Sequence, residues 1–213
     1  MYVTSCTRLD IAFSIGMLSR FTSSPDKEHW DALDRLMRYL KGTKDHALCY
    51  TGYPPTLEGY SDASWCSKVG NSKSTSGFIF TLGGAAVTWK SKRQTCITLS
   101  SMEAELFVLA SAGEEADWIK NLILDIPLSR VQVNSLSLYC DNQVAVQVVK
   151  NILFNTKRRH VQLRHTLLNY LKEQDIITLI DVRSKDNLTD PLMKGMPKDR
   201  SIKIVGEMRL KAI

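Results

Sequence analysis

The chain has 213 residues, of which 44% are hydrophobic and 23% are charged, and its formal net charge is +6 at pH 7. This composition excludes a wholly disordered chain, and no apolar run approaches the ~20 residues that a membrane span requires. The N-terminus has no basic segment leading into an apolar core, so we expect an intracellular protein, cytoplasmic or nuclear, rather than a secreted one. The five cysteines are scattered and contain no C-x-x-C pair, which disfavours a disulfide framework and a zinc site. The basic charge favours an anionic partner without identifying it.

The first part of the chain is predicted to be mostly helical. Residues 8–21 form one helical candidate, and residues 24–40 form a second, with Ser24 as its N-cap and Pro25 in its first turn. The apolar face expected for the second helix consists of Trp30, Leu33, Met37 and Leu40. The strongest break in the pattern follows at Pro54 and Pro55. We therefore predict a helical extension over residues 1–53 and a second domain over residues 54–213.

The second domain alternates between strand-like and helix-like patterns. The expected strands cover residues 57–62, 77–84, 85–91, 135–141 and 176–182, and Gly83-Gly84 joins two of them as a hairpin would. The expected helices cover residues 100–123, 142–151, 158–174 and, as a short final helix, 187–196. Strands come first as a meander and then alternate with helices, which predicts an α/β fold with a mixed sheet covered by helices.

Acidic residues stand at the ends of these elements. Asp62 ends the first strand of the second domain, Glu105 lies in the first turns of the long helix, and Asp141 ends the strand "SLSLYCD". Asp190 precedes the last helical segment. Strand ends and helix starts converge at one edge of such sheets, so these carboxylates can meet there although they are far apart in sequence.

Glu105 is the most informative of them because of its helical phase. It heads an apolar stripe spaced by three or four residues, which should face the sheet. The stripe consists of Met102, Leu109, Ala112, Ala116, Ile119 and Ile123. Neighbouring Glu103 lies roughly 200° away around the helix and, three residues after Ser100, fits a capping box. We therefore assign the chemistry to Glu105 and the cap to Glu103.

Taken singly, each aspartate is better explained as a turn or capping residue than as a catalytic one. Asp62 fits a turn, Asp141 fits the N-cap of the helix "NQVAVQVV", and Asp190 fits a cap before Pro191. Only their joint placement argues for a site.

The ordered blocks of the second domain provide a more specific signal. Seven short blocks follow one another along this domain: "GYSDASW", "KSTSGFIFTLGG", "WKSKRQ", "LSSMEAE", "YCDNQVAV", "RRHVQLRH" and "DNLTDPLMKG". In order and spacing they resemble the ribonuclease H domain at the end of the Pol polyprotein of copia-type LTR retrotransposons. The first 53 residues resemble the C-terminal tail of the reverse transcriptase that precedes this domain.

The resemblance implies a ribonuclease H-like fold with a five-stranded mixed sheet flanked by helices. It implies four metal-binding catalytic carboxylates at Asp62, Glu105, Asp141 and Asp190, the last of which the residue patterns alone did not select. It also implies two Mg²⁺ ions, replaceable by Mn²⁺, and hydrolysis of the RNA strand of RNA:DNA hybrids. The remainder of a Pol polyprotein would be a partner if the chain is part of a longer product.

One departure from the family pattern concerns the fourth carboxylate, because Pro191 follows Asp190 directly. If the final helix starts at Pro191, Asp190 becomes its N-cap and turns toward backbone amides; if it starts near Asn187, the proline lies in the first turn and is tolerated.

Basic residues supply candidate phosphate contacts, with a merely solvated charged face as the alternative. The candidates are Lys90, Lys92, Arg93, Arg158 and Arg159, with Lys157 and Arg164 beside them. Trp65 and Trp89 are expected in the core, and His160 and His165 on a solvated helix face.

Two other functions compete with the nuclease. A catalytically silent or domesticated retroelement fragment would bind nucleic acid or a partner through the same fold. An integrase or transposase of related fold takes its glutamate from a late helix, whereas the well-placed Glu105 lies between Asp62 and Asp141. The order of the acids therefore favours ribonuclease H.

Overall fold

The computed structural model of the chain describes residues 2–51, 55–65, 73–126, 135–151, 158–196 and 198–212. Pro54, at the predicted boundary, and Lys157, a predicted phosphate contact, lie outside these ranges. Among the described ranges, no helix is both long enough and apolar enough to cross a membrane.

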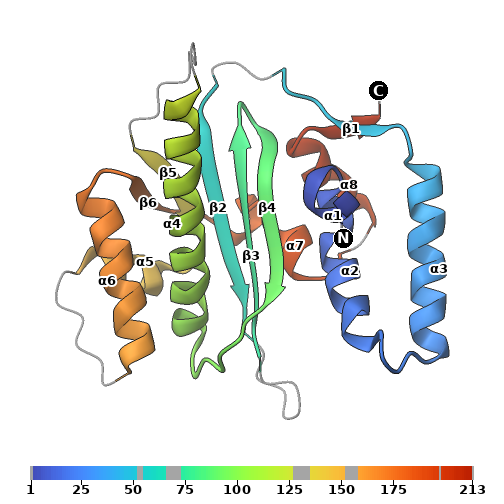
Figure 1. Ribbon diagram of the computed structural model, residues 1–213, viewed down its shortest axis with the longest axis horizontal. Helices are drawn as coiled ribbons and strands as arrows, with labels where there is room; N and C mark the ends of the chain where they lie inside the picture. The colour runs from blue at the N-terminus through green and yellow to red at the C-terminus, as the bar shows by residue number, and fades with distance from the viewer. Residues whose placement is uncertain are drawn as a thin grey trace.

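A five-stranded sheet forms the centre of the molecule (Figure 1). Its strands are β2 (Leu57–Ser64), β3 (Thr75–Leu82), β4 (Ala85–Arg93), β5 (Leu136–Cys140) and β6 (Ile177–Asp181). In space they run in the order β4-β3-β2-β5-β6. The pairs β2–β3 and β3–β4 are antiparallel, whereas β2–β5 and β5–β6 are parallel. The predicted mixed sheet is thereby confirmed.

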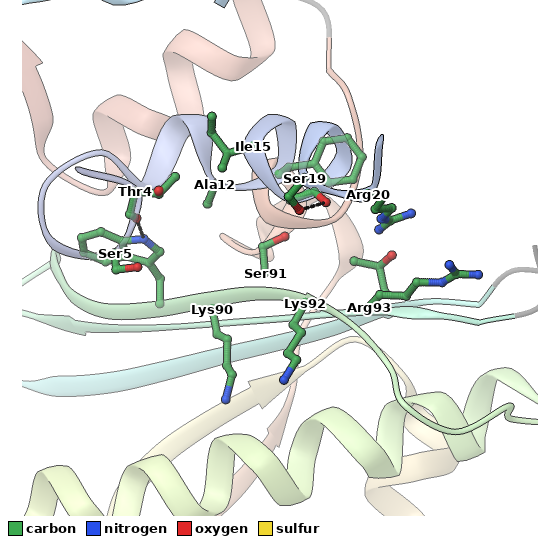
Figure 2. Close-up of a pocket in the computed structure, with 14 residues that line it drawn as sticks. Thr4, Ser5, Ala12, Ile15, Ser19, Arg20, Lys90, Ser91, Lys92 and Arg93 are labelled. Carbon is green, nitrogen blue, oxygen red and sulfur yellow. Dashed lines mark hydrogen bonds between the residues drawn. The ribbon is translucent and has the colours of Figure 1, made fainter. Parts of the chain in front are cut away.

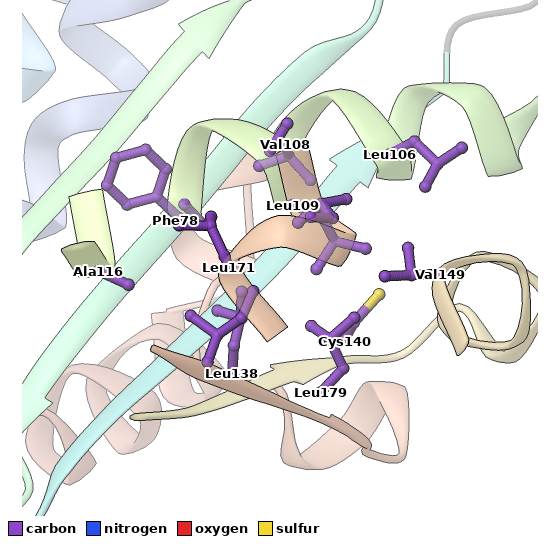
Figure 3. Packing of buried hydrophobic residues seen from close by; sticks show 14 of the residues in the cluster. Phe78, Leu106, Val108, Leu109, Ala116, Leu138, Cys140, Val149, Leu171 and Leu179 are labelled. Atoms are coloured by element: carbon purple, nitrogen blue, oxygen red, sulfur yellow. The ribbon is translucent and has the colours of Figure 1, made fainter. Parts of the chain in front are cut away.

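Helices cover one face of this sheet and enclose the main core. They are α4 (Ser101–Asp125), α5 (Gln143–Lys150) and α6 (Arg159–Glu173). The predicted stripe of α4 is buried at Leu109, Ala112, Ala116 and Ile119, and Met102 and Ile123 pack against its margin. Figure 3 shows Leu109 and Ala116 of α4 in the same cluster as Phe78, Leu138 and Leu171 from β3, β5 and α6.

The N-terminal extension covers the opposite face of the sheet. Its helices are α1 (Tyr2–Cys6), α2 (Ala12–Leu18) and α3 (Lys27–Gly42), with short 3-10 turns at Leu9–Ile11 and Ser19–Phe21. Together with α7 (Asp190–Met193) and α8 (Lys198–Glu207), it encloses a second buried cluster. This cluster joins Leu9 of the extension to Ile79 and Trp89 of the sheet, and the indole of Trp89 donates a hydrogen bond to the Thr4 carbonyl oxygen at 2.7 Å.

The last part of the extension also pairs with the C-terminal strand of the chain. Strand β1 (His46–Leu48) is antiparallel to β7 (Leu210–Ala212), forming a separate two-stranded sheet. The Cys49 amide donates to the Arg209 carbonyl oxygen at 3.0 Å beside this pair. The extension and the sheet domain therefore share both a core and backbone hydrogen bonds.

Several local expectations were wrong. Helix α3 begins at Lys27 with Asp26 as its N-cap instead of Ser24, and Trp30 and Met37 of its expected apolar face are 60% and 59% exposed. Trp65 is 44% exposed, while Trp89 lies in the core as expected. His165 is buried, since its Nε2 lies 3.0 Å from the carbonyl oxygens of Val148 and Asn151.

Candidate active site

The first carboxylate of the site lies within strand β2, near its end. Alternate residues of β2 are buried against α4, among them Ser61 and Ala63, so Asp62 between them points to the other face of the sheet. Its register partner on β3 is Gly77. Because β2 continues through Ser64, Asp62 is a strand residue and not the turn residue that it would be if taken alone.

Glu105 reaches the same end of the sheet from α4. Its side chain is only 3% exposed, and Oε1 accepts a hydrogen bond from the Ala63 amide at 3.1 Å, which ties the helix to β2 next to Asp62. Its other oxygen, Oε2, lies 3.8 Å from the Sγ of Cys140, whose thiol is the donor. A buried carboxylate with one backbone donor and one weak thiol donor is poorly compensated.

Glu103 has the capping role that its helical phase predicts. The Ser100 hydroxyl accepts a hydrogen bond from the Glu103 amide at 3.2 Å, and the Glu103 carboxylate accepts one from the Leu99 amide at 2.9 Å. The same carboxylate forms an ion pair with Arg158 of the segment entering α6. Glu103 therefore fixes the start of α4, and with it the position of Glu105.

Asp141 follows the last residue of β5, at the same edge of the sheet. Its Oδ2 accepts a hydrogen bond from the Ser184 hydroxyl at 2.6 Å. The helix that follows is capped by Asn142, whose side-chain oxygen accepts from the Ala145 amide at 3.0 Å. The capping explanation for Asp141 is therefore wrong, and its carboxylate is available to the site.

Asp190 is the first residue of α7, with Thr189 as its N-cap, so neither of the two expected helix starts is right. Pro191 lies in the first turn, where a missing amide hydrogen costs no helical hydrogen bond. The Asp190 side chain does not cap the helix; it forms ion pairs with Lys194 at 2.7 Å and Arg200 at 2.6 Å.

A glycine sets how closely α7 approaches the sheet. A Cβ at Gly77 would lie 2.5 Å from the Sδ of Met193 and 3.2 Å from the Cβ of Leu192. Only a residue without a side chain fits there. Since Gly77 is the register partner of Asp62, this close contact is what brings Asp190 near the β2 carboxylate.

Electrostatic interactions connect the carboxylates with one another. Burial raises the pKa of Asp62 to about 6, and the charges of Asp141 and Asp190 add to that rise. Burial also raises the pKa of Glu105 to about 9, with the charge of Asp62 as the next cause. Without a cation, Glu105 is therefore protonated at neutral pH. These residues form a negative, partly dry site in which added positive charge is favourable.

The donor set fits a hard divalent cation, because carboxylate oxygens are the ligands that Mg²⁺ and Mn²⁺ prefer. One atom each from Glu105, Cys140 and Asp141 lies within 4.8 Å of the others. The residue patterns did not select Cys140. Strand alternation in "SLSLYCD", which turns Cys140 inward toward α4 beside Asp141, is the signal that could have found it.

The residues predicted to contact phosphates do not form one cluster but lie on both faces of β4 and at the start of α6. Lys90 and Lys92 point to the α4 face of β4, while Ser91 and Arg93 point to the face covered by the extension (Figure 2). Lys90 and Lys92 line a cavity of about 160 Å³ with Arg164, whose guanidinium stacks 3.3 Å from the ring centroid of Phe107. Arg159 is exposed, and Arg158 is held by Glu103.

Two of the solved structures with a similar arrangement are ribonucleases H. RNase H1 from Halobacterium salinarum NRC-1 is 16% identical, with a TM-score of 0.46, over 64% of this chain and 93% of that chain. LC11-RNase H1, solved in complex with an RNA/DNA hybrid, is 13% identical, with a TM-score of 0.48 and the same coverage of 64% and 93%. The strand order and the helices on both faces of the sheet give this chain a ribonuclease H-like fold.

Sequence relatives are closer. The chain is 34% identical over 200 residues to the retrovirus-related Pol polyprotein from transposon TNT 1-94 of Nicotiana tabacum, and 33% identical over 195 residues to that from transposon RE2 of Arabidopsis thaliana. These matches cover 94% and 90% of this chain but only 15% and 13% of those polyproteins.

A shorter relative is the secreted RxLR effector protein 161 of Plasmopara viticola, 44% identical over 120 residues, which covers 56% of this chain and 84% of that protein. No protein-family model matches the chain. On the strength of the sequence relatives, the chain is homologous, over at least nine tenths of its length, to a short segment of the retrovirus-related Pol polyproteins of transposons.

Proposed function

We propose that the chain is a metal-dependent endonuclease that hydrolyses the RNA strand of RNA:DNA hybrids. One observation supports this above all others: carboxylates far apart in sequence meet at one edge of the sheet, where the charges of Asp141 and Asp190 help to raise the pKa of Asp62, and the charge of Asp62 that of Glu105. Structural acids that cap helices or close turns do not need to be brought together in this way. A site with this surplus of negative charge is suited to divalent cations.

The proposed mechanism assigns the ligand roles to Asp62, Glu105, Asp141 and Asp190. Two Mg²⁺ ions, or Mn²⁺ in their place, would supply an activated water and stabilise the leaving 3′ oxygen of the RNA. The chain itself positions the ligands: the Ala63 amide orients Glu105, and the Ser184 hydroxyl orients Asp141. Burial of Glu105 behind the sheet edge excludes water from that side of the site.

The basic residues of β4 and α6 would bind the hybrid. One small cavity on the α4 face is lined by Lys90, Lys92 and Arg164. Thr95, from the loop that leads into α4, lines the same cavity. Cations in these positions can contact the phosphates of the hybrid. The 2′-hydroxyls of the RNA strand would distinguish it from DNA. In a longer product, the rest of the Pol polyprotein would be the covalent partner, and an intracellular location remains a prediction.

The test is a cleavage assay on a hybrid whose RNA strand carries a 5′ label. We expect RNA products in Mg²⁺ or Mn²⁺, none in EDTA, and none with Asp62→Asn. Duplex DNA of the same sequence should stay intact. Equal cutting of duplex DNA would contradict the substrate, and cutting in EDTA would contradict the mechanism.

A second function, binding without cleavage, is favoured by one specific observation. Both oxygens of Asp190 are occupied by cations of the chain itself, Lys194 and Arg200. If these cations keep Asp190 from binding Mg²⁺, the site lacks one of its four ligands, and the chain would act as a silent hybrid-binding domain. Hybrid binding in the absence of any metal-dependent product would support this alternative.

A further inference from the structure

The extension and the sheet enclose a cavity of about 480 Å³ on the face opposite α4. Helix α2 and the turn after it form one wall, and the end of β4 forms the other (Figure 2). Helix α2 packs against β4, and a Cβ on Gly16 would lie in ordinary van der Waals contact with the Ser91 carbonyl oxygen, 3.9 Å away. Residues far apart in sequence therefore line one hollow.

Two guanidiniums, from different parts of the chain, face the same end of this cavity. Arg20 comes from the 3-10 turn Ser19–Phe21 of the extension, and Arg93 is the last residue of β4. Figure 2 shows both side chains extending in the same direction, away from Thr4 and Ser5. Burial, and next the charge of Arg93, lower the pKa of Arg20, so the two cations are close enough to repel each other.

The surroundings do not neutralise Arg20. Among the described residues that line the cavity there is no carboxylate, and the polar groups near the arginines are hydroxyls such as those of Ser19, Ser91 and Thr75. Within the described part of the chain, no acidic side chain pairs with Arg20. The hydroxyls of Ser19 and Ser91 already donate to the carbonyl oxygens of Gly16 and Leu192. The donors suited to a phosphate, which accepts several hydrogen bonds at once, are therefore the two adjacent guanidiniums.

The register of the sheet places this pair beside the carboxylates. Asp62 pairs with Gly77, which pairs with Ser91, and Arg93 lies two residues further along β4 on the same face. From strand spacing and rise, the backbone of Arg93 lies on the order of 12 Å from that of Asp62. A strand of nucleic acid whose phosphate sits at the carboxylates can therefore place another phosphate at the arginine pair.

We propose that Arg20 and Arg93 together form a phosphate-binding site through which the N-terminal extension holds the nucleic-acid strand alongside the carboxylates. This inference rests on the proposed function for its ligand, a nucleic-acid backbone. It assigns a role to the extension, for which the sequence predicted none.

The test measures hybrid affinity in EDTA, so that binding is read without cleavage. A fluorescent RNA:DNA hybrid is titrated at several salt concentrations with the parent chain, Arg20→Ala, Arg20→Lys and the control Arg38→Ala. The control Arg38→Ala removes an equal charge from the exposed side of α3, where Arg38 pairs with Asp34. Thermal melts of each variant confirm that it is folded.

We expect Arg20→Ala to weaken hybrid binding roughly three- to tenfold and to reduce the slope of log affinity against log salt by about one. Arg20→Lys should keep the slope and lose part of the affinity, because an ammonium cannot bind a phosphate in bidentate fashion. Arg38→Ala should change neither quantity.

Two outcomes would overturn the inference. One is a folded Arg20→Ala variant with the parent affinity and slope. The other is an Arg20→Ala variant that no longer binds inorganic phosphate, as measured by calorimetry, but keeps the parent affinity for the hybrid. That result would mean that the arginine pair binds small anions and not the nucleic-acid backbone. The proposed nuclease is judged separately in Mg²⁺: Arg20-dependent binding without cleavage contradicts the nuclease alone, and cleavage with Arg20-independent binding contradicts this site alone.

Discussion

Arg200 of α8 donates a hydrogen bond from Nη2 to Oδ2 of Asp190, 2.6 Å away, while Lys194 holds the other carboxylate oxygen at 2.7 Å. Asp190 is buried, so these two cations are its compensation when no metal is bound. A metal ion that takes Asp190 as a ligand must compete with these two cations for its oxygens. The constraint on Asp190 therefore comes from ion pairs and not from Pro191.

Replacing Arg200 should release Asp190 for metal binding. We expect Arg200→Ala to lower the Mg²⁺ concentration that gives half-maximal cleavage, while Lys203→Ala, an exposed cation of the same helix, leaves it unchanged. For the same reason Asp190→Asn should damage activity less than Asp62→Asn. Mg²⁺ titrations of the cleavage rate measure all of these, and a higher Mg²⁺ requirement for Arg200→Ala would show that the ion pair supports the site.

Substitutions of Glu105 and Glu103 in α4 should affect different properties, cleavage in the first case and stability in the second. Glu105→Gln should abolish cleavage, since it removes a metal ligand, yet keep a hydrogen bond to the Ala63 amide and a folded chain. Glu103→Gln should cost about 1–3 kcal/mol of unfolding free energy through its ion pair with Arg158 and retain measurable cleavage. Activity assays beside chemical denaturation decide this, and the reverse pattern would mean that the two roles are exchanged.

The stability of the metal-free protein should fall as pH rises. The pKa of Glu105 is about 9 in the folded chain against an ordinary value of 4.5, so the folded state binds this proton more tightly than the unfolded state does. The contribution is fully present below pH 4.5 and is lost as pH rises toward 9.

Denaturation in EDTA at a series of pH values between these limits measures this loss. Glu105→Gln should flatten the decline, and it should be more stable than the parent at the upper end. Added Mg²⁺ should restore the stability of the parent there, because the cation compensates the carboxylates. A parent and Glu105→Gln with parallel pH profiles would contradict the raised pKa.

Gly77 should be intolerant of even one methyl group. Gly77→Ala places a Cβ 2.5 Å from the Met193 Sδ and 3.2 Å from the Leu192 Cβ, so the buried Met193 side chain or α7 itself must shift. We expect a loss of about 1–3 kcal/mol of unfolding free energy and a weaker metal site. Gly42→Ala, at the end of α3 with no atom within 4 Å of its Cβ, should leave both unchanged or slightly raise stability. Equal melts for the two variants would contradict this close contact.

The extension should be needed for the stability of the whole chain. Leu9 is fully buried between the extension and the sheet, so Leu9→Ala should cost about 2–5 kcal/mol of unfolding free energy. Met37→Ala on the exposed side of α3 should cost little. Urea denaturation of both variants, followed by a probe in each part, checks this. A Leu9→Ala variant whose sheet domain keeps the parent midpoint would show that the extension is independent.

Most of the fold and part of the candidate site could be predicted from the sequence, because they depend on interactions between residues that are close in sequence. Alternation predicted the strands, and a three-to-four spacing predicted α4 together with the buried face that Glu105 heads. The capping box separated Glu103 from Glu105 because it depends only on residues three positions apart. In each case the decisive interaction lies within one turn of helix or along one strand.

Contacts between distant residues decided the rest. No local pattern shows that Arg200 and Lys194 neutralise Asp190, or that the Gly77 position must stay empty for Met193. The burial of His165, the exposure of Trp65 and the meeting of Arg20 with Arg93 likewise depend on where separate segments come to lie. The sequence by itself determined which residues are candidates for the chemistry, since that depends on residue type and phase. Only the tertiary structure decided how those charges are compensated, because an electrostatic environment depends on neighbours in space, not in sequence.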